Sequence, residues 1–242
     1  MSDSPLHTIK QVLKRIPAIG PAMAYALVHS RITRATPTRT DLAVYDPAVY
    51  WKERYRTGGD SGPGSEGRLA EFKAEIINEF AAKEKVESVI EFGCGDGRQL
   101  KLSRYQKYLG IDISEIVLEK CRMIFADQSE YRFQSLEEYI DETADLTLSL
   151  DVIAYLGDDD MFSTYMNKLF NAATRYVIIY ASNSDSPPAL SVPHLRNREF
   201  TLWVAANKPD WHLIRHIPNR YPSKGKAPET STSDFFIFKK SN

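Results

Sequence analysis

The chain has 242 residues, of which 43% are hydrophobic and 26% are charged, so it suits one globular domain with accessory elements rather than two independent domains. Its formal net charge of −1 gives no global field that would favour nucleic acid as a partner. The two cysteines, Cys94 and Cys121, form neither a disulfide framework nor a zinc-binding pattern, so we expect no metal and reduced thiols in a cytoplasmic protein.

The first 45 residues differ in character from the rest. Residues 6–16 and 21–32 predict two short helices, and residues 33–47 predict a polar linker. Residues 1–40 carry six basic side chains and one acidic side chain. An apolar stretch within them resembles a signal peptide, but Pro17, Gly20 and Pro21 interrupt it. We expect residues 1–45 to be a helical arm and linker. Residues 1–32 would dock on the inner face of a membrane, on the chain's own domain or on another subunit.

From residue 46 onward the pattern predicts one α/β domain, residues 46–242. A glycine- and serine-rich stretch, Gly58–Ser65, is either a connector or a lid over a ligand, and helical spacing follows from Leu69 to Phe80. Strands and helices then alternate. The predicted strands are Val86–Phe92, Tyr108–Ile113, Tyr131–Phe133, Leu146–Leu150, Tyr176–Tyr180, His212–Ile217 and Phe235–Lys239, and the helices lie around Leu100–Leu102, Val117–Phe125, Phe162–Phe170 and Arg198–Asn207. This order predicts a Rossmann-like three-layer sandwich with a seven-stranded, mostly parallel sheet, an antiparallel hairpin at its edge, and N-terminal helices.

The clearest chemical motif is a glycine loop, Glu91-x-Gly93-x-Gly95-x-Gly97, between a predicted strand and a predicted helix. Glycines let the backbone turn tightly and approach a ligand closely. Glu91 ends the strand, where a carboxylate can face a cationic ligand. Asp112 closes the next strand at the spacing from which an acidic residue reaches a ribose diol.

These residues resemble class I S-adenosylmethionine-dependent methyltransferases, whose first motif reads acidic-x-Gly-x-Gly-x-Gly. The resemblance implies S-adenosylmethionine as cofactor, with the three glycines along its methionine part and Asp112 on its ribose hydroxyls. It also implies cofactor contacts near the adenine or at the end of the fourth strand, from Ile113, Gln134, Ser135, Leu136 and Asp151. Cys94 lies inside the loop and fits a small filler better than a nucleophile. Arg68 either pairs with the cofactor carboxylate or begins a helix.

Residues from Tyr50 to Lys239 also resemble a bacterial methyltransferase group often associated with glycan or polysaccharide biosynthesis. The shared marks include Tyr50-Trp51, Gly58–Ser65, Ser149-Leu-Asp-Val-Ile153 and Ile217-Pro-Asn-Arg-Tyr-Pro222. The group commonly carries Tyr-His where this chain has Ala154-Tyr155. If that histidine takes part in the chemistry of the group, its role is either lost in this chain or moved to another residue.

Methyl transfer to a hydroxyl requires alignment of the acceptor and removal of its proton. His194, in a loop after the fifth strand, is the first candidate base because the ordinary pKa of histidine suits the task. Asp151 and Tyr155 are the next candidates. The alternative for His194 is a surface loop residue without a catalytic role. The alternative for Asp151 is to orient the cofactor amine.

The acceptor contacts that the sequence offers are aromatic faces and polar donors that suit a sugar or another polar ring, namely Trp51, Tyr55, Asn219, Arg220 and Tyr221. The alternative for Trp51 and Tyr55 is packing, and for residues 218–222 a rigid loop. We therefore expect O-methylation of a small molecule or glycan. N-methylation, protein methylation and a non-catalytic cofactor-binding subunit are the alternatives.

Overall fold

The computed structural model describes residues 46–186, 195–223 and 229–241. The helices predicted at residues 6–16 and 21–32, and nearly all of the predicted linker, lie outside the described residues. The division at residue 45 therefore stays a prediction.

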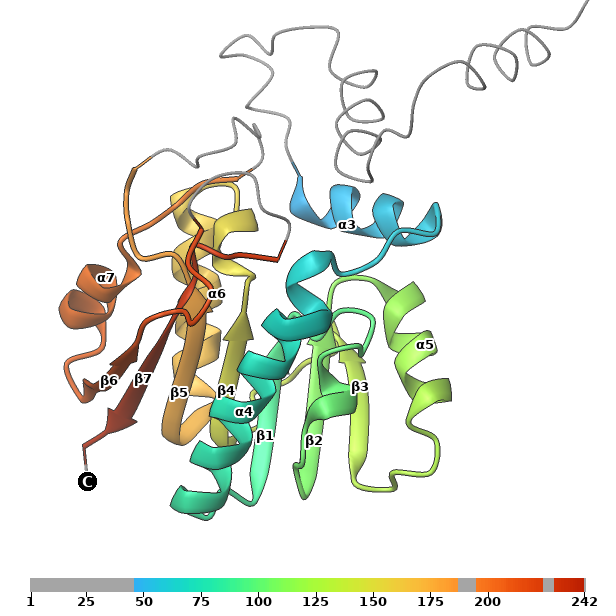
Figure 1. Cartoon of the computed structure of the whole chain (residues 1–242), viewed down its shortest axis with the longest axis horizontal. Coiled ribbons are helices and arrows are strands. Elements are labelled where there is room, and N and C mark those ends of the chain that lie inside the picture. The colour runs from blue at the N-terminus through green and yellow to red at the C-terminus, as the bar shows by residue number, and fades with distance from the viewer. Residues whose placement is uncertain (1–45, 187–194, 224–228, 242) are drawn as a thin grey trace, which may run out of the picture. The chain divides into compact units, whose positions relative to one another are not determined.

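A seven-stranded sheet with the order β3-β2-β1-β4-β5-β7-β6 forms the centre of the domain (Figure 1). The first five strands pair in parallel, whereas β7 runs antiparallel to both β5 and β6. The predicted mostly parallel sheet with an antiparallel edge hairpin is thus confirmed. The strands are β1 Ser88–Phe92, β2 Lys107–Asp112, β3 Tyr131–Ser135, β4 Ala144–Leu150, β5 Ala173–Ala181, β6 Trp211–Ile217 and β7 Asp234–Lys240.

Helices cover both faces of the sheet and make the predicted three layers (Figure 1). α4 (Gly67–Glu84) and α5 (Glu115–Ile124) pack on one face, and α6 (Asp159–Asn171) and α7 (Phe200–Asn207) pack on the other. Apolar side chains at helical spacing explain this packing, since α6 buries Phe162, Met166 and Leu169 along one stripe. The central strands β4 and β5 are buried along most of their length because both of their faces are covered.

Two connections differ from the alternation that the sequence suggested. The helix predicted around Leu100–Leu102 is only a 3-10 turn, η3 (Leu100–Leu102), because the few residues between the glycine loop and β2 leave no room for a helix. Residues 136–143, between β3 and β4, also form no helix, and Tyr139 and Leu136 of this connection cover the sheet instead.

The helix α3 (Pro47–Arg56) lies across the end of the sheet where the parallel strands finish (Figure 1). Asp46 caps it by accepting the N–H of Ala48 at 2.7 Å, and the fixed φ of Pro47 suits the first helical position. The short turns η2 (Pro63–Ser65) and η4 (Ile153–Tyr155) lie on the connections that reach this same end. Ligands of open α/β sheets bind at the carboxyl ends of the strands, so the site is built here.

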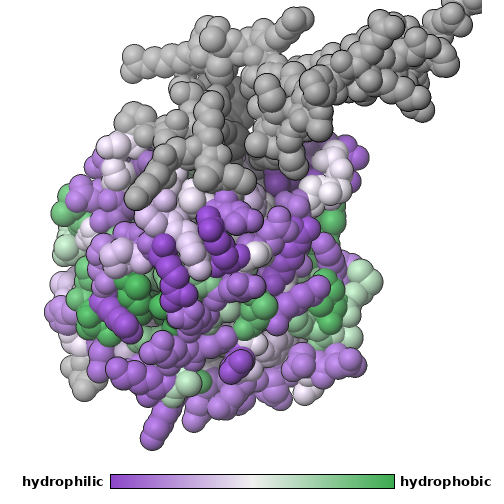
Figure 2. All heavy atoms as spheres, in the orientation of Figure 1, coloured by the Kyte–Doolittle hydropathy of each residue, from purple (hydrophilic) through white to green (hydrophobic). Residues whose placement is uncertain are grey.

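The face of the molecule shown in Figure 2 is mainly hydrophilic, with separate small hydrophobic patches. Single exposed apolar side chains such as Val49, Met123 and Ile140 account for part of the apolar surface. Among the described residues, no helix combines the length and the apolar character that a bilayer span requires.

Candidate active site

The glycine loop, Glu91–Gly97, makes a tight turn that only glycine suits at its key positions. Gly93, Gly95 and Gly97 have φ angles of 85°, 57° and 76°, in the left-handed region. The N–H of Gly93 donates to the Ile111 carbonyl at 2.7 Å, which ties the loop to the end of β2. A Cβ on Gly93 would lie 2.5 Å from Val152 Cγ2, so the residue after Asp151 packs directly on the loop.

Asp112 lies at the carboxyl end of β2 and is held by backbone donors. Its Oδ2 accepts the N–H of Gly95 at 2.9 Å, and its Oδ1 accepts the N–H of Ser114 at 3.0 Å. Burial raises the pKa of Asp112 to about 6, although these backbone donors act in the opposite direction. Ser135 pairs with Asp112 in register, and the Leu136 N–H donates to its carbonyl at 3.0 Å. The structure therefore brings these predicted cofactor contacts together.

The predicted adenine side is less complete. Ile113, next to Asp112, is half-buried. The Oε1 atom of Gln134 is buried without a hydrogen-bond partner, while its Nε2 donates to Glu142 at 3.3 Å. Glu138, which the sequence analysis did not single out, accepts the Ser135 N–H at 3.2 Å and places a carboxylate just beyond β3.

Glu91 lies in β1, just before the turn of the glycine loop. Its side chain is buried beneath α4, and the Tyr108 hydroxyl donates to its Oε2 at 2.6 Å. Burial raises the pKa of Glu91 to about 7, and the nearby Lys73 ammonium partly offsets this effect. The Glu91 carboxylate is thus enclosed in the core with Tyr108 as its donor, and its contact with a cationic ligand stays a prediction.

Cys94 and Cys121 fill space behind the loop. Both sulfur atoms approach the Gly95 carbonyl, at 3.9 Å and 3.4 Å. The hydrogen bond with Cys121, together with burial, raises the pKa of the Cys94 thiol well above its usual range. A neutral buried thiol is a filler and not a nucleophile.

The glycine segment, Gly58–Ser65, packs on the glycine loop. Ser61 Oγ accepts the N–H of Asp96 at 3.0 Å. Arg98, which follows the loop, contacts the Asp60 carboxylate at 3.1 Å. Of the two sequence-based alternatives, a cover over the loop fits these contacts better than a free connector.

An aromatic cluster of Tyr50, Trp51, Tyr55 and Tyr155 joins α3 to the turn η4. The Trp51 ring lies 5.5 Å from that of Tyr55 and 4.9 Å from that of Tyr155, and the Tyr50 ring lies 6.5 Å from that of Tyr155. On the side of the cluster that faces the glycine segment, the Tyr55 hydroxyl contacts Ser61 Oγ at 3.1 Å. The cluster thus extends from the glycine segment to the end of β4, and it gathers predicted residues from two distant parts of the chain.

Asp151 follows β4 and is held from two sides. Its Oδ2 lies 3.2 Å from the Lys73 ammonium, and its Oδ1 accepts the Ser233 hydroxyl at 2.8 Å. Its N–H donates to the Tyr180 carbonyl at 2.8 Å, and its own φ is 59°, a left-handed value unusual for a residue with a side chain. A Cβ on Gly64 would lie 3.1 Å from Oδ2, so the carboxylate lies under the glycine segment.

The sequence analysis missed Lys73 and Ser233. Lys73 lies four residues after Leu69 and four before Ile77, so helical spacing could have marked it as a cation on the buried face of α4. Ser233 precedes β7, and no sequence pattern relates it to Asp151. Asn219 supports this region, since its Nδ2 donates to the Tyr180 hydroxyl at 2.6 Å and to the Ser233 carbonyl at 2.8 Å.

Two predicted contacts are engaged elsewhere. The Arg220 guanidinium pairs with the Glu75 carboxylate at 2.6 Å and 2.8 Å on the exposed side of α4, and its contact with an acceptor stays a prediction. The Arg68 Nε donates to the Glu229 carbonyl at 2.8 Å, and the guanidinium lies 4.5 Å from the ring centroid of Tyr221. These contacts tie Arg68 and Tyr221 to each other beside the site.

His194, the first candidate base, lies outside the described residues. The described histidines, His212 and His216, both lie on β6 and contact Ser241 Oγ and the Asp234 carboxylate, each at 2.8 Å. The structure describes the two other candidate bases, Asp151 and Tyr155. Of these, Asp151 offers a carboxylate at the end of β4. In the described part of the chain, no three side chains form a metal-binding group.

Comparisons with known proteins match this geometry. Residues 90–177 match a family described as a methyltransferase domain. This part of the chain is therefore similar to a methyltransferase domain. No curated relative matches the chain.

Solved methyltransferases share the fold of this domain. The N-methyltransferase NodS from Bradyrhizobium japonicum WM9, in complex with S-adenosylhomocysteine, is 14% identical with a TM-score of 0.62, over 81% of this chain and 100% of that chain. The magnesium protoporphyrin IX methyltransferase from Synechocystis PCC 6803 with bound S-adenosylmethionine is 15% identical with a TM-score of 0.57, over 82% and 99%. The methyltransferase domain of a bacterial Hen1 protein is 17% identical with a TM-score of 0.54, over 70% and 97%.

The residues of the methyltransferase domain fit S-adenosylmethionine. The glycine loop packs directly against Val152, Ser61 and Phe125, since a Cβ on Gly93, Gly95 or Gly97 would collide with these side chains. Asp112 offers carboxylate oxygens at the place where a ribose diol needs acceptors. The Asp112 carboxylate thus suits the ribose of a nucleoside such as S-adenosylmethionine.

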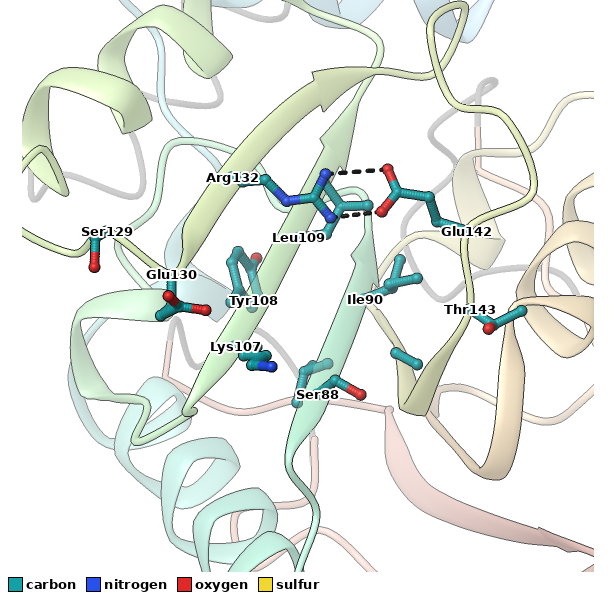
Figure 3. Close-up of a pocket in the computed structure, with 12 residues that line it drawn as sticks. Ser88, Ile90, Lys107, Tyr108, Leu109, Ser129, Glu130, Arg132, Glu142 and Thr143 are labelled. Carbon is teal, nitrogen blue, oxygen red and sulfur yellow. Dashed lines mark hydrogen bonds and ion pairs between the residues drawn. The ribbon is translucent and has the colours of Figure 1, made fainter.

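A cavity of about 320 Å³ lies at the opposite end of the sheet, lined by the amino ends of β1, β2, β3 and β4. Figure 3 shows Arg132 and Glu142 pointing toward each other there, and their Nη1 and Oε1 atoms are 3.2 Å apart. The Arg132 hydrogen bond lowers the pKa of Glu142, as in an ordinary surface ion pair. This cavity holds none of the predicted catalytic groups, so it is not the candidate active site.

Proposed function

We propose that the domain transfers the methyl group of S-adenosylmethionine to a hydroxyl group of a small molecule or of a sugar in a glycan. The observation that carries this proposal is the Asp151 carboxylate at the end of β4. It is fixed by Lys73 and Ser233, and its side chain is still 34% exposed. A fixed carboxylate beside aromatic faces suits an acceptor with a hydroxyl group and a sugar or other ring.

The residues around the glycine loop would hold the cofactor. When bound, S-adenosylmethionine supplies a methyl group on a positively charged sulfur. Asp112 would accept the ribose hydroxyls, and Ser135 and Leu136 would flank the adenine. Tyr55 and Ser61, which contact each other above the loop, would exclude water from this end of the sheet.

Asp151 would remove the proton from the acceptor. The hydroxyl proton passes to a carboxylate oxygen of Asp151 as the acceptor oxygen becomes nucleophilic, and it then leaves to solvent through the exposed side of the carboxylate. A positioned base contributes about 10²–10⁴-fold to the rate. His194 stays the alternative base, and the position of its loop after β5 along the chain supports that alternative.

A panel of hydroxylated acceptors, including free sugars and sugar-containing glycans, tests the proposal through release of S-adenosylhomocysteine. We expect turnover to fall by about 10²–10⁴-fold in Asp151→Asn, with affinity for S-adenosylhomocysteine close to that of the native protein. The same loss in His194→Ala but not in Asp151→Asn would move the base to His194. Methylation of a hydroxyl at native rates in both variants would contradict a base-assisted reaction.

An amine is the second candidate acceptor. Carboxylates and aromatic faces also attract ammonium groups, and Asp151 lies near the aromatic cluster. An amine must lose its own proton before it reacts, so its methylation rate should rise with pH up to the amine pKa. A matched pair of amine and hydroxyl acceptors on the same scaffold separates the two candidates.

For residues 1–32 we propose, from sequence alone, contact with an anionic membrane surface on its cytoplasmic side or with another subunit. The basic excess of residues 1–40 supports this proposal. The prolines within the segment favour the subunit over a continuous interfacial helix.

A further inference from the structure

We propose that Lys73 is a positioning residue for methyl transfer. From inside the core its ammonium pairs with the Asp151 carboxylate and holds it in one orientation at the acceptor side of the site. This inference rests on the proposed role of Asp151.

Lys73 is a buried cation on an otherwise apolar helix face. It is 1% exposed, and its neighbours Leu69, Phe72 and Ile77 on α4 are also buried. An ammonium removed from water is retained only where a partner compensates its charge. The partner that the structure provides is Asp151 Oδ2 at 3.2 Å, with the Tyr180 ring centroid 5.2 Å from Nζ.

The ion pair is asymmetric. The ammonium is enclosed, whereas the Asp151 side chain is 34% exposed. Ser233 donates to the other carboxylate oxygen, so both oxygens have a fixed donor on the protein side. The charge that remains accessible to a ligand is therefore that of the carboxylate, in a single orientation.

Stability alone does not explain this arrangement. Replacement of a buried ion pair by well-packed apolar side chains is often neutral or stabilising. Asp151 also has a left-handed φ of 59°, which costs free energy for a residue with a side chain. The buried Lys73 charge and a strained backbone are thus found together at Asp151, directly after β4. Both features are typical of functional sites.

Two titratable side chains from different elements act on Asp151, Lys73 of α4 through the ion pair and Tyr180 of β5 through a charge interaction. Glu91 of β1 lies near Lys73, and Asp234 of β7 lies near Tyr180. Lys73 is the cation among these groups. Burial, together with the Asp151 and Asp234 charges, raises the pKa of the Tyr180 hydroxyl, and the Lys73 charge counters the rise in the pKa of Glu91. Loss of the ammonium would remove the opposite charge beside Asp151, and loss of an opposite charge favours the protonated form of a carboxyl group.

Three variants test the inference. Lys73→Met removes the charge, Lys73→Arg keeps it, and Lys83→Met removes an exposed charge from the same helix as the matched control. The titration midpoint of the Asp151 carboxyl, followed by carbon NMR and assigned with Asp151→Asn, should rise by about 1–3 pH units in Lys73→Met, the range over which a nearby opposite charge acts. Lys73→Arg should restore most of the native midpoint, and Lys83→Met should leave it unchanged.

The pH dependence of methyl transfer separates positioning from packing. Since Asp151 must be ionised to accept a proton, the acidic limb of the profile should move to higher pH in Lys73→Met together with the carboxyl midpoint. Should Lys73→Met not fold, Lys73→Gln takes its place, because it keeps a donor without the charge.

An unchanged carboxyl midpoint in the uncharged variant would overturn the inference while leaving the proposed function intact. A raised midpoint with an unmoved acidic limb would overturn Asp151 as the base, and with it the part of Lys73 in catalysis.

Discussion

Replacement of Asp112 by Ala should weaken the binding of S-adenosylhomocysteine by about 5- to 150-fold. Asp112 is 8% exposed and accepts two backbone N–H groups, at 2.9 Å from Gly95 and 3.0 Å from Ser114. The substitution removes these bonds and the expected bonds to the ribose hydroxyls. Each hydrogen bond to a charged group contributes about 1.5–3 kcal/mol. Water that enters the vacated space offsets part of this, so we expect a net loss of about 1–3 kcal/mol, and about 1.4 kcal/mol corresponds to tenfold.

Isothermal titration calorimetry measures this loss directly. Asp112→Asn keeps the shape and one acceptor oxygen, so it should lie between Ala and the native residue. Asp127→Ala is the matched control because Asp127 is an exposed aspartate after α5. Native affinity in Asp112→Ala would remove Asp112 from the site and refute the assignment of the ribose position.

Four further predictions follow from the same geometry. The pKa of Asp112 is about 6 and its ionised form binds the ribose, so affinity for S-adenosylhomocysteine should fall as pH drops below about 6, and Asp112→Asn should remove this dependence. Burial raises the pKa of Glu91 from 4.5 to about 7, so the folded state loses stability as pH rises through that range and Glu91 ionises. Glu91→Gln should therefore raise the melting temperature relative to the native protein above pH 7, with no such gain below pH 4.5. Gly95→Ala should abolish measurable cofactor binding because its new Cβ collides with Ser61 Oγ, whereas Gly58→Ala has comparable left-handed strain (φ 84° against 57°) but meets no atom and should bind normally. Co-sedimentation of the full chain with anionic vesicles at low salt should decide between the membrane and the subunit for residues 1–32, and no sedimentation would eliminate the membrane.

Local sequence patterns predicted the sheet and the glycine loop because both depend on short segments. The apolar runs that became β1, β4 and β5 are buried on both faces, and such strands are recognisable without knowledge of their partners. The spacing from Gly93 to Asp112 likewise reflects one strand-loop-strand unit, so its geometry was available from the sequence.

The acceptor side could not be predicted in the same way because it depends on tertiary contacts. Asp151 receives its donors from α4 and from the segment before β7, at Lys73 and Ser233, which no local pattern relates. Arg220 had the chemistry of an acceptor contact, yet the packing of its loop on α4 directs it to Glu75. The helix expected after the glycine loop is only the turn η3, because β2 begins a few residues after the loop.

A crystal structure with S-adenosylhomocysteine tests the central claim most directly. We predict that the ligand lies at the carboxyl ends of β1 and β2, with its ribose hydroxyls hydrogen-bonded to Asp112 and its sulfur facing Asp151 and the aromatic cluster. Density for the ligand in the cavity at the amino ends of the strands, or at any place out of reach of Asp112, would contradict the account.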